Sequence, residues 1–185
     1  VGYSKNKAET DKLMLGQLLA GKELGKHIFD KHWMLSRNRT NIPLWISDHP
    51  VTIQSLDGSD RSLGIASEGV QINIPLTPIL NLSFICDSII AKMKLIGQQY
   101  LVERTLFQNP PPKHEGEDRI RKFLSDVVEK QVVDLDESNV AHLNHLQVRS
   151  SYRYIYSREN DFNLAKEMIS TFDVFKFGRR IVMEN

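Results

Sequence analysis

Alternating apolar and polar residues predict a block of β-strands in the first half of the chain. From Val70 to Leu76 every second residue is apolar, which is the period of a strand with one buried face. Other runs rich in β-branched and aromatic residues predict further strands at 28–37, 44–47, 51–54 and 79–86. The link at Pro75–Pro78 is too short for a crossover helix, so we expect neighbouring strands to run antiparallel in one sheet.

The first two strands are expected to pair with each other as a hairpin. Turn-forming residues at 38–41 separate the strands at 28–37 and 44–47, and a link of this length suits a hairpin. Trp33 lies within the first of these strands, so we expect its side chain to be largely buried in the sheet.

A period of 3.6 residues predicts helices on both sides of the strand block. Helices are expected at 6–26, 89–107, 117–130 and 136–153, with a last one beginning at Asp161. Gly25 is expected to end the first helix, and Asp136 to cap the start of the fourth. Alternation from Phe172 to Val182 predicts a terminal strand or an extended tail. This order predicts an α+β fold, with an antiparallel sheet of about four to five strands flanked by helices.

Length and composition indicate a single soluble domain, residues 1–185. Of its 185 residues 41% are hydrophobic, which is enough for a sizeable core. No apolar run approaches the roughly 18 residues of a membrane span. A net charge of +1 gives no general attraction to nucleic acid or to an anionic membrane. Because a helical pattern follows Val1 almost at once, without an initiator methionine, we expect the C-terminal part of a longer protein; its oligomeric state stays open.

The single cysteine, Cys86, excludes an intrachain disulfide bond. A reducing, cytoplasmic location is therefore the default expectation. Cys86 ends an apolar run with no electropositive feature beside it in the sequence, so we expect a buried and unreactive thiol.

Three motif-like segments stand out: Pro43–Val51, Ile74–Pro78 and Leu143–Ser157. The first is similar to a "pro-phe-ile-ser-asp-x-pro-val" signature, with Leu44-Trp45 where phenylalanine is usual. The second is similar to "pro-leu-ser-pro", and the third to "leu-asn … ala-x-arg-tyr-val-tyr-ser". Together they resemble an uncharacterised, mainly bacterial family of domains of unknown function. The resemblance implies membership but no activity, since that family has no established reaction; its "his-x-val-pro … tyr-leu" start is absent here.

The Ser47–Pro50 turn is the strongest candidate for chemistry. Asp48 is of the type that ligates a divalent metal such as Mg²⁺ or Mn²⁺, and His49 of the type that acts as a base near neutral pH. The predicted helix at 136–153 is expected to bring Asn144 towards this turn. We therefore expect a metal-assisted phosphodiester hydrolase, resembling a nuclease, with Asp48, His49 and Asn144 as its catalytic residues.

The alternative is a non-enzymatic interaction or nucleic-acid-binding module in which the same residues are structural. Asp48 would then accept backbone N–H bonds and Pro50 would end the strand. Carboxylates converging on Asp48 in a cleft would favour the enzyme, and a buried Asp48 with its oxygens on backbone N–H groups would favour the module. An Asp…Glu-x-Lys nuclease pattern is incomplete, because Glu68-Gly69-Val70 lacks the lysine.

Basic and aromatic residues near the end of the predicted 136–153 helix are candidates for phosphate or nucleic-acid contacts. Arg149, Arg153 and Tyr154 have the residue types that pair with phosphates and stack on bases. The alternative is a solvated helix end with tyrosines packed in the core. His142 and His145 are spaced i, i+3 on one helix face, as in a shared metal site, although solvated or core-edge histidines are commoner.

Overall fold

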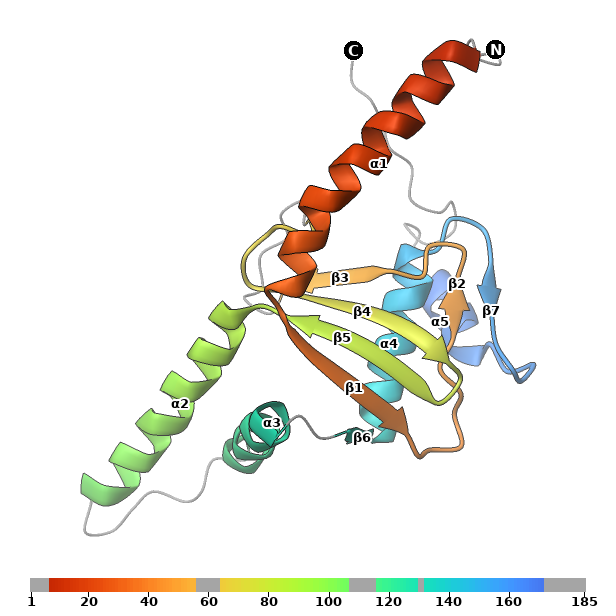
Figure 1. The fold of residues 1–185 in the computed structure, drawn as a ribbon. Coiled ribbons are helices and arrows are strands. Elements are labelled where there is room, and N and C mark those ends of the chain that lie inside the picture. Colours follow the sequence, from red (N-terminus) through yellow and green to blue (C-terminus); the bar gives the residue numbers. More distant parts are fainter. Residues whose placement is uncertain (1–6, 56–63, 107–115, 130–131, 172–185) are drawn as a thin grey trace.

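A computed structural model describes residues 7–55, 64–106, 116–129 and 132–171. Its centre is a five-stranded sheet with strand order β3-β4-β5-β1-β6 (Figure 1). The strands are β1 (His32–Asn38), β3 (Thr52–Ser55), β4 (Val70–Thr77), β5 (Leu80–Ile85) and β6 (Val133–Leu135). All neighbours are antiparallel except β1 and β6, which are parallel. The predicted α+β class and the pairing of β4 with β5 are confirmed.

The expected strand at 44–47 has a different position from the one predicted. Within this range only two residues form a strand, β2 (Ile46–Ser47). It pairs with β7 (Ile155–Tyr156) in a separate two-stranded sheet. The predicted hairpin with the first strand is therefore wrong, because β1 pairs with β5 and β6 instead. Pro43 and Pro50 flank this segment and have no N–H to donate to a ladder, which leaves room for only a short pairing.

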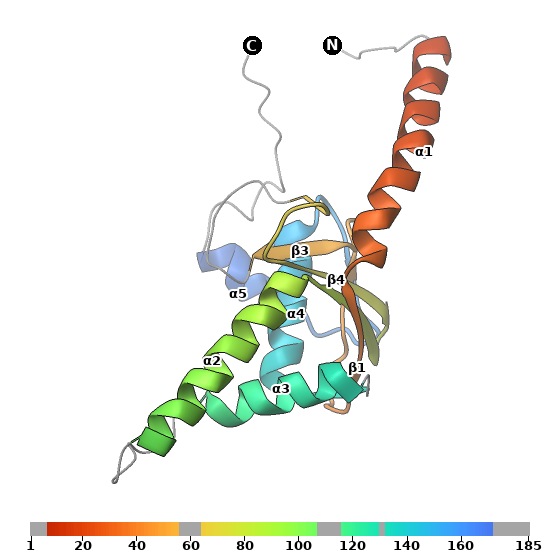
Figure 2. The same ribbon diagram turned by 60° about the vertical axis from the view of Figure 1, so that its left-hand side comes forward.

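Five helices are described: α1 (Lys7–Phe29), α2 (Asp87–Leu106), α3 (Glu117–Glu129), α4 (Glu137–Ser150) and α5 (Asn163–Thr171). The helix α4 lies behind one face of the sheet, whereas α1 and α2 extend away from it (Figure 1). A second view shows α3 beside α2 (Figure 2). These two helices approach closely at Gly97, where an added Cβ would lie 3.7 Å from Ile120 and Leu124. No described helix is long and apolar enough to cross a membrane.

Two predicted boundaries are wrong for identifiable reasons. Gly25 does not end α1, which continues to Phe29, so the strand expected from residue 28 begins only at His32. A mid-helix glycine costs about 1 kcal/mol but does not by itself break the helix. The helix α4 ends at Ser150 rather than near Arg153, because the backbone N–H groups of residues 152 and 153 donate to another partner, described below. The predicted cap at Asp136 is confirmed, since its side chain accepts from Asn139 N. The expected element at 172–182 lies outside the described residues.

Trp33 is not buried, and this prediction is wrong. Its side chain is 50% exposed. Its ring contacts Phe84 edge-on at 4.9 Å and Phe29 at 5.8 Å. Because side chains alternate along a strand, Trp33 lies on the sheet face opposite Met34 and Ser36, which face α3 and α4. No helix among the described residues covers that opposite face (Figure 1).

The helix α4 takes part in two of the three apolar clusters of the described core. One cluster joins Leu44 to Val140, Leu143 and Leu146. A second joins Trp45 to Val148, Ala165 and Met168. The third lies between the sheet and α2 and contains Val70, Ile85, Cys86, Ile89 and Ile90. The segment at 44–45 is therefore fixed against α4 by apolar burial as well as by the hydrogen bonds described next.

Cys86 is buried, as predicted, at 7% exposure. The expectation that no electropositive group adjoins it is wrong. The Lys31 ammonium donates to the Cys86 Sγ at 2.9 Å. Lys31 comes from the turn between α1 and β1, so the fold creates this contact from residues that are distant in the sequence.

Candidate functional site

The Ser47–Pro50 turn is fastened to the segment that follows α4. One carboxylate oxygen of Asp48 accepts the N–H of Tyr152 and the other accepts the N–H of Arg153, each at 2.9 Å. The Asp48 N–H donates to the Tyr154 carbonyl at 3.1 Å. The side chain is exposed. Its contacts are those of a structural carboxylate that holds two chain segments together.

Two amide side chains of α4 hydrogen-bond the backbone on either side of β2. Asn144, at 1% exposure, accepts from Trp45 N at 2.8 Å and donates to the Pro43 carbonyl at 3.0 Å. The expected approach of Asn144 to this part of the chain is thereby confirmed. Each amide has one donor and one acceptor end, and here both ends are used.

Gln147 repeats the same arrangement one helical turn later, and it is also 1% exposed. Its Oε1 accepts from both the N–H and the hydroxyl of Ser47 at 2.9 Å. Its Nε2 donates to the Pro50 carbonyl at 2.9 Å. The buried backbone of this segment is therefore satisfied by side chains of α4 where no sheet neighbour is available.

All three motif-like segments of the sequence meet at this place. The Leu44 N–H donates to the Pro78 carbonyl at 2.9 Å, which joins the first segment to the second. Pairing of β2 with β7, together with the Asn144 and Gln147 bonds, joins the first segment to the third. We call this hydrogen-bonded assembly of residues 43–50, 78, 144, 147 and 152–156 the signature junction.

The signature junction brings the predicted catalytic residues into one region without giving them the contacts of a metal site. His49 is exposed, and its ring contacts Tyr152 edge-on at 5.6 Å. Within the described ranges no group of three or more His, Cys, Asp or Glu side chains could hold a metal ion. Metal binding at Asp48 stays a prediction. The two backbone N–H bonds match the structural alternative, whereas the expected burial of Asp48 is wrong, because the side chain is exposed.

The predicted phosphate-binding residues are exposed around the same junction. Arg149 and Arg153 are exposed, and Tyr154 is 57% exposed with its ring 6.4 Å from that of Tyr156. The alternative in which the tyrosines pack in the core is therefore wrong. Contact with nucleic acid stays a prediction. Burial lowers the pKa of the nearby His145, and the charges of His142 and Arg149 lower that pKa further.

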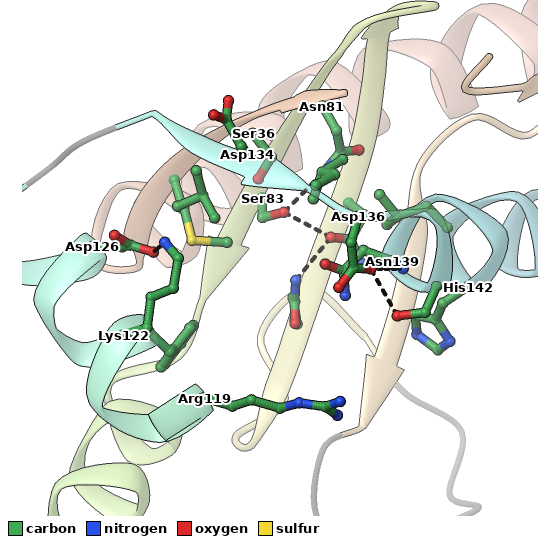
Figure 3. A pocket seen from close by; sticks show the side chains of 18 of the residues that line it. Ser36, Asn81, Ser83, Arg119, Lys122, Asp126, Asp134, Asp136, Asn139 and His142 are labelled. Atoms are coloured by element: carbon green, nitrogen blue, oxygen red, sulfur yellow. Dashed lines mark hydrogen bonds and ion pairs between the residues drawn. The ribbon is translucent and has the colours of Figure 1, made fainter. Parts of the chain in front are cut away.

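A cavity that the sequence did not reveal lies between the sheet and the helices α3 and α4. Its volume is about 460 Å³ (Figure 3). The floor is formed by Ser36, Asn73, Asn81 and Ser83, each 1% exposed. Polar residues thus occupy the face of the sheet on which a core would ordinarily pack.

The floor residues are hydrogen-bonded to one another. Asn81 Nδ2 donates to Ser83 Oγ at 3.0 Å, and the Ser83 hydroxyl donates to Asn73 Oδ1 at 2.8 Å. The remaining amide atoms, Asn73 Nδ2 and Asn81 Oδ1, are buried without a hydrogen-bond partner. An unpartnered buried polar atom costs about 1–3 kcal/mol, so the floor is unfavourable for stability.

The same chain of bonds continues to the rim at α4. Gln71 Nε2 donates to Asn73 Oδ1 at 2.9 Å, and Gln54 Nε2 donates to Gln71 Oε1 at 3.3 Å. His142 Nε2 lies 2.7 Å from Gln54 Oε1. We call this series the amide relay; it contains Asn81, Ser83, Asn73, Gln71, Gln54 and His142.

Charged side chains surround the mouth of the cavity. Arg119 extends across it from α3, and Lys122 pairs with Asp126 at 2.7 Å (Figure 3). Hydrogen bonds from Arg37 and Arg39 lower the pKa of Asp134.

The backbone N–H of Asn139 and then the Ser138 hydroxyl lower the pKa of Asp136. Asp134 and Asp136 are therefore both ionised at neutral pH. The rim combines cations and carboxylates, whereas the floor is uncharged.

Comparison with known proteins adds family membership to this geometry. The model of a family described as "Protein of unknown function (DUF4238)" matches residues 5–161. The match confirms the expected membership of a domain family of unknown function. No curated protein and no solved structure matches the chain.

We expect Asp48→Asn to lower the free energy of unfolding by about 1–2 kcal/mol. An asparagine keeps one acceptor oxygen, and its NH₂ group would face a backbone N–H, so one of the two bonds to 152 and 153 is lost. The measurement is urea unfolding, with Glu103→Gln on the exposed surface of α2 as the matched control. Equal stability of the two variants would remove the structural role of Asp48.

Asn144→Leu is expected to cost about 2–5 kcal/mol, because Trp45 N–H and Pro43 C=O would both be buried without partners. The control is Asn163→Leu, an exposed amide on α5 that should change stability by less than about 0.5 kcal/mol. Urea unfolding of both variants gives the comparison. A stability loss no larger than that of the control would show that the signature junction does not depend on this amide.

Proposed function

Because the chain belongs to the DUF4238 family of proteins of unknown function, its activity has to be argued from its own geometry, and we propose that it binds a small polar molecule. The site is the cavity between the sheet, α3 and α4. One observation carries the proposal: the floor consists of polar side chains at 1% exposure, two of which leave an amide atom unpartnered.

A polar floor with unpartnered atoms does not stabilise the folded chain, so stability does not explain its presence. Apolar residues in place of the whole hydrogen-bonded floor would fill the same face of the sheet without the two unpartnered amide atoms. Local features that work against stability, without an evident compensating gain, concentrate at functional sites. The two unpartnered atoms have almost no accessible surface, so a ligand with hydrogen-bonding groups would supply their missing partners once the side chains that cover them move.

Size and lining describe the class of ligand. A cavity of about 460 Å³ suits a small molecule rather than a macromolecule. Carboxylates also line the cavity, but Asp126 is paired with Lys122, and Asp134 with Arg37 and Arg39. Arg119 extends over the cavity beside Asp136 and is the cation that would meet an anionic group of a ligand. Met34 and Phe123 add apolar surface to the lining. We therefore propose a compact, hydrogen-bonding ligand that carries one anionic group.

This proposal develops the non-enzymatic alternative drawn from the sequence. The two backbone N–H groups on the Asp48 carboxylate support it, because they give that residue a structural role. Metal-assisted phosphodiester hydrolysis at Asp48 remains a separate prediction that the contacts of the described residues do not favour. A cytoplasmic location is part of the same proposal.

The proposal is tested by thermal unfolding of the whole chain with nucleoside monophosphates, sugar phosphates and amino acids as probes. A ligand at one hundred times its Kd stabilises by about 2.7 kcal/mol. For a chain of this size that corresponds to a rise in Tm of about 5–10 °C. Arg119→Ala should reduce the rise at least by half, because the anionic group loses its partner.

Two further variants make this test specific to the cavity. Asn81→Leu should unfold without ligand at the same or a higher temperature than the unmodified chain, yet lose the ligand-induced rise. Lys92→Ala, at an exposed position on α2, should keep the full rise. The proposal fails if no probe raises the Tm, or if Arg119→Ala and Asn81→Leu both respond as Lys92→Ala does.

A further inference from the structure

The amide relay has a direction, and that direction decides what the cavity floor offers a ligand. Each link needs one donor and one acceptor, so the state of the first group fixes the state of the next. When His142 Nε2 carries a proton, it donates to Gln54 Oε1, and Gln54 then donates to Gln71. The series continues to Asn73 and leaves its Nδ2 as an unpartnered donor.

At the far end of the relay the same direction fixes Asn81. The single proton of the Ser83 hydroxyl is used on Asn73 Oδ1, so Ser83 Oγ accepts from Asn81 Nδ2. The unpartnered atom of Asn81 is then Oδ1, an acceptor. In this direction the unpartnered groups of the floor are a donor at Asn73 and an acceptor at Asn81, and a ligand reaches them when the side chains that cover them move.

The opposite direction satisfies the same contacts. If His142 carries its proton on Nδ1, its Nε2 accepts from Gln54. Each side-chain amide of the relay is then flipped, so that its oxygen and its nitrogen exchange positions. Asn73 Nδ2 then donates to Gln71 and Ser83, and the Ser83 hydroxyl donates to Asn81 Oδ1. The unpartnered atoms become an acceptor at Asn73 and a donor at Asn81, which is the reverse pattern.

We propose that His142, acting through Gln54, is the specificity-determining residue that sets which hydrogen-bonding pattern the cavity floor presents. The effect on ligand choice rests on the proposed function, whereas the relay itself is a property of the free protein. A protonated imidazole donates from both nitrogens, so it holds the relay in the first direction. A neutral ring allows either direction, so protonation of His142 selects the one that suits ligands with an acceptor facing Asn73 and a donor facing Asn81.

Other titratable and charged groups lie around His142. His145 lies on the same helix, and Asp136 caps the start of that helix. The helix α3 contributes Arg119 and the Lys122–Asp126 pair, and β6 contributes Asp134. The pKa values of Asp134 and Asp136 are lowered by their hydrogen bonds, so His145 is the group from which the effect of His142 has to be separated.

The test is a ¹⁵N NMR titration of the free, full chain through the protonation of His142. The side-chain NH₂ resonances of Asn73 and Asn81 should shift with the same midpoint as the His142 ring nitrogens. In His142→Ala, an exposed position whose change should leave the fold intact, these shifts should disappear although His145 still titrates. Gln54→Leu, which interrupts the relay, should abolish them as well.

Gln98→Leu, an exposed amide on α2, is the matched control and should keep the coupled shifts. Floor resonances that do not follow His142, or that still follow pH in His142→Ala, would overturn the proposal. A cavity that binds no probe in the thermal test would refute the proposed function and leave these titrations unchanged, so the two failures are distinguishable.

Discussion

The structure depends on backbone groups of residues 43–50 being satisfied inside the protein without a full sheet neighbour. Prolines at both ends of this segment prevent a regular ladder, so two amide side chains of α4 replace it. Asn144 and Gln147 each use a donor and an acceptor end, and Asp48 takes two N–H groups from the chain after α4. Buried Leu44 and Trp45 add apolar contacts to the same place. These interactions explain why the three motif-like segments occur together.

Two faces of the helix α4 have different roles in this account. Asn144 and Gln147 face the signature junction, while His142 and Leu143 line the cavity beside the sheet. Fixing α4 against residues 43–50 therefore also fixes one wall of the cavity. In this account Asp48 and Asn144, which the sequence suggested as catalytic residues, stabilise the fold. Buried hydrogen-bonding atoms without a partner lie on the sheet at Asn73 and Asn81, and in the junction at the Trp45 indole N–H.

Much of the fold follows from periodicity, because β4, β5 and the helices α2 to α4 carry their patterns locally. The exposure of Trp33 and the pairing of the strand at 44–47 do not follow from periodicity. Both depend on which elements pack on each face of the sheet. The approach of Asn144 was predictable from helical spacing. The cavity was not: Gln71, Asn73, Asn81 and Ser83 show the alternation of a solvated strand face, and only the positions of α3 and α4 make that face buried. The Lys31–Cys86 contact likewise arises from tertiary structure alone.

The central claim is that the signature junction maintains the fold while the amide-lined cavity binds the ligand. The most direct measurement is a map of backbone amide shifts in the full chain when the stabilising probe from the thermal test is added. The account predicts that the largest changes lie at Ser36, Asn73, Ser83 and the first turns of α4. Largest changes at Ser47–Pro50 and Tyr152–Tyr154, with the cavity residues unaffected, would contradict it.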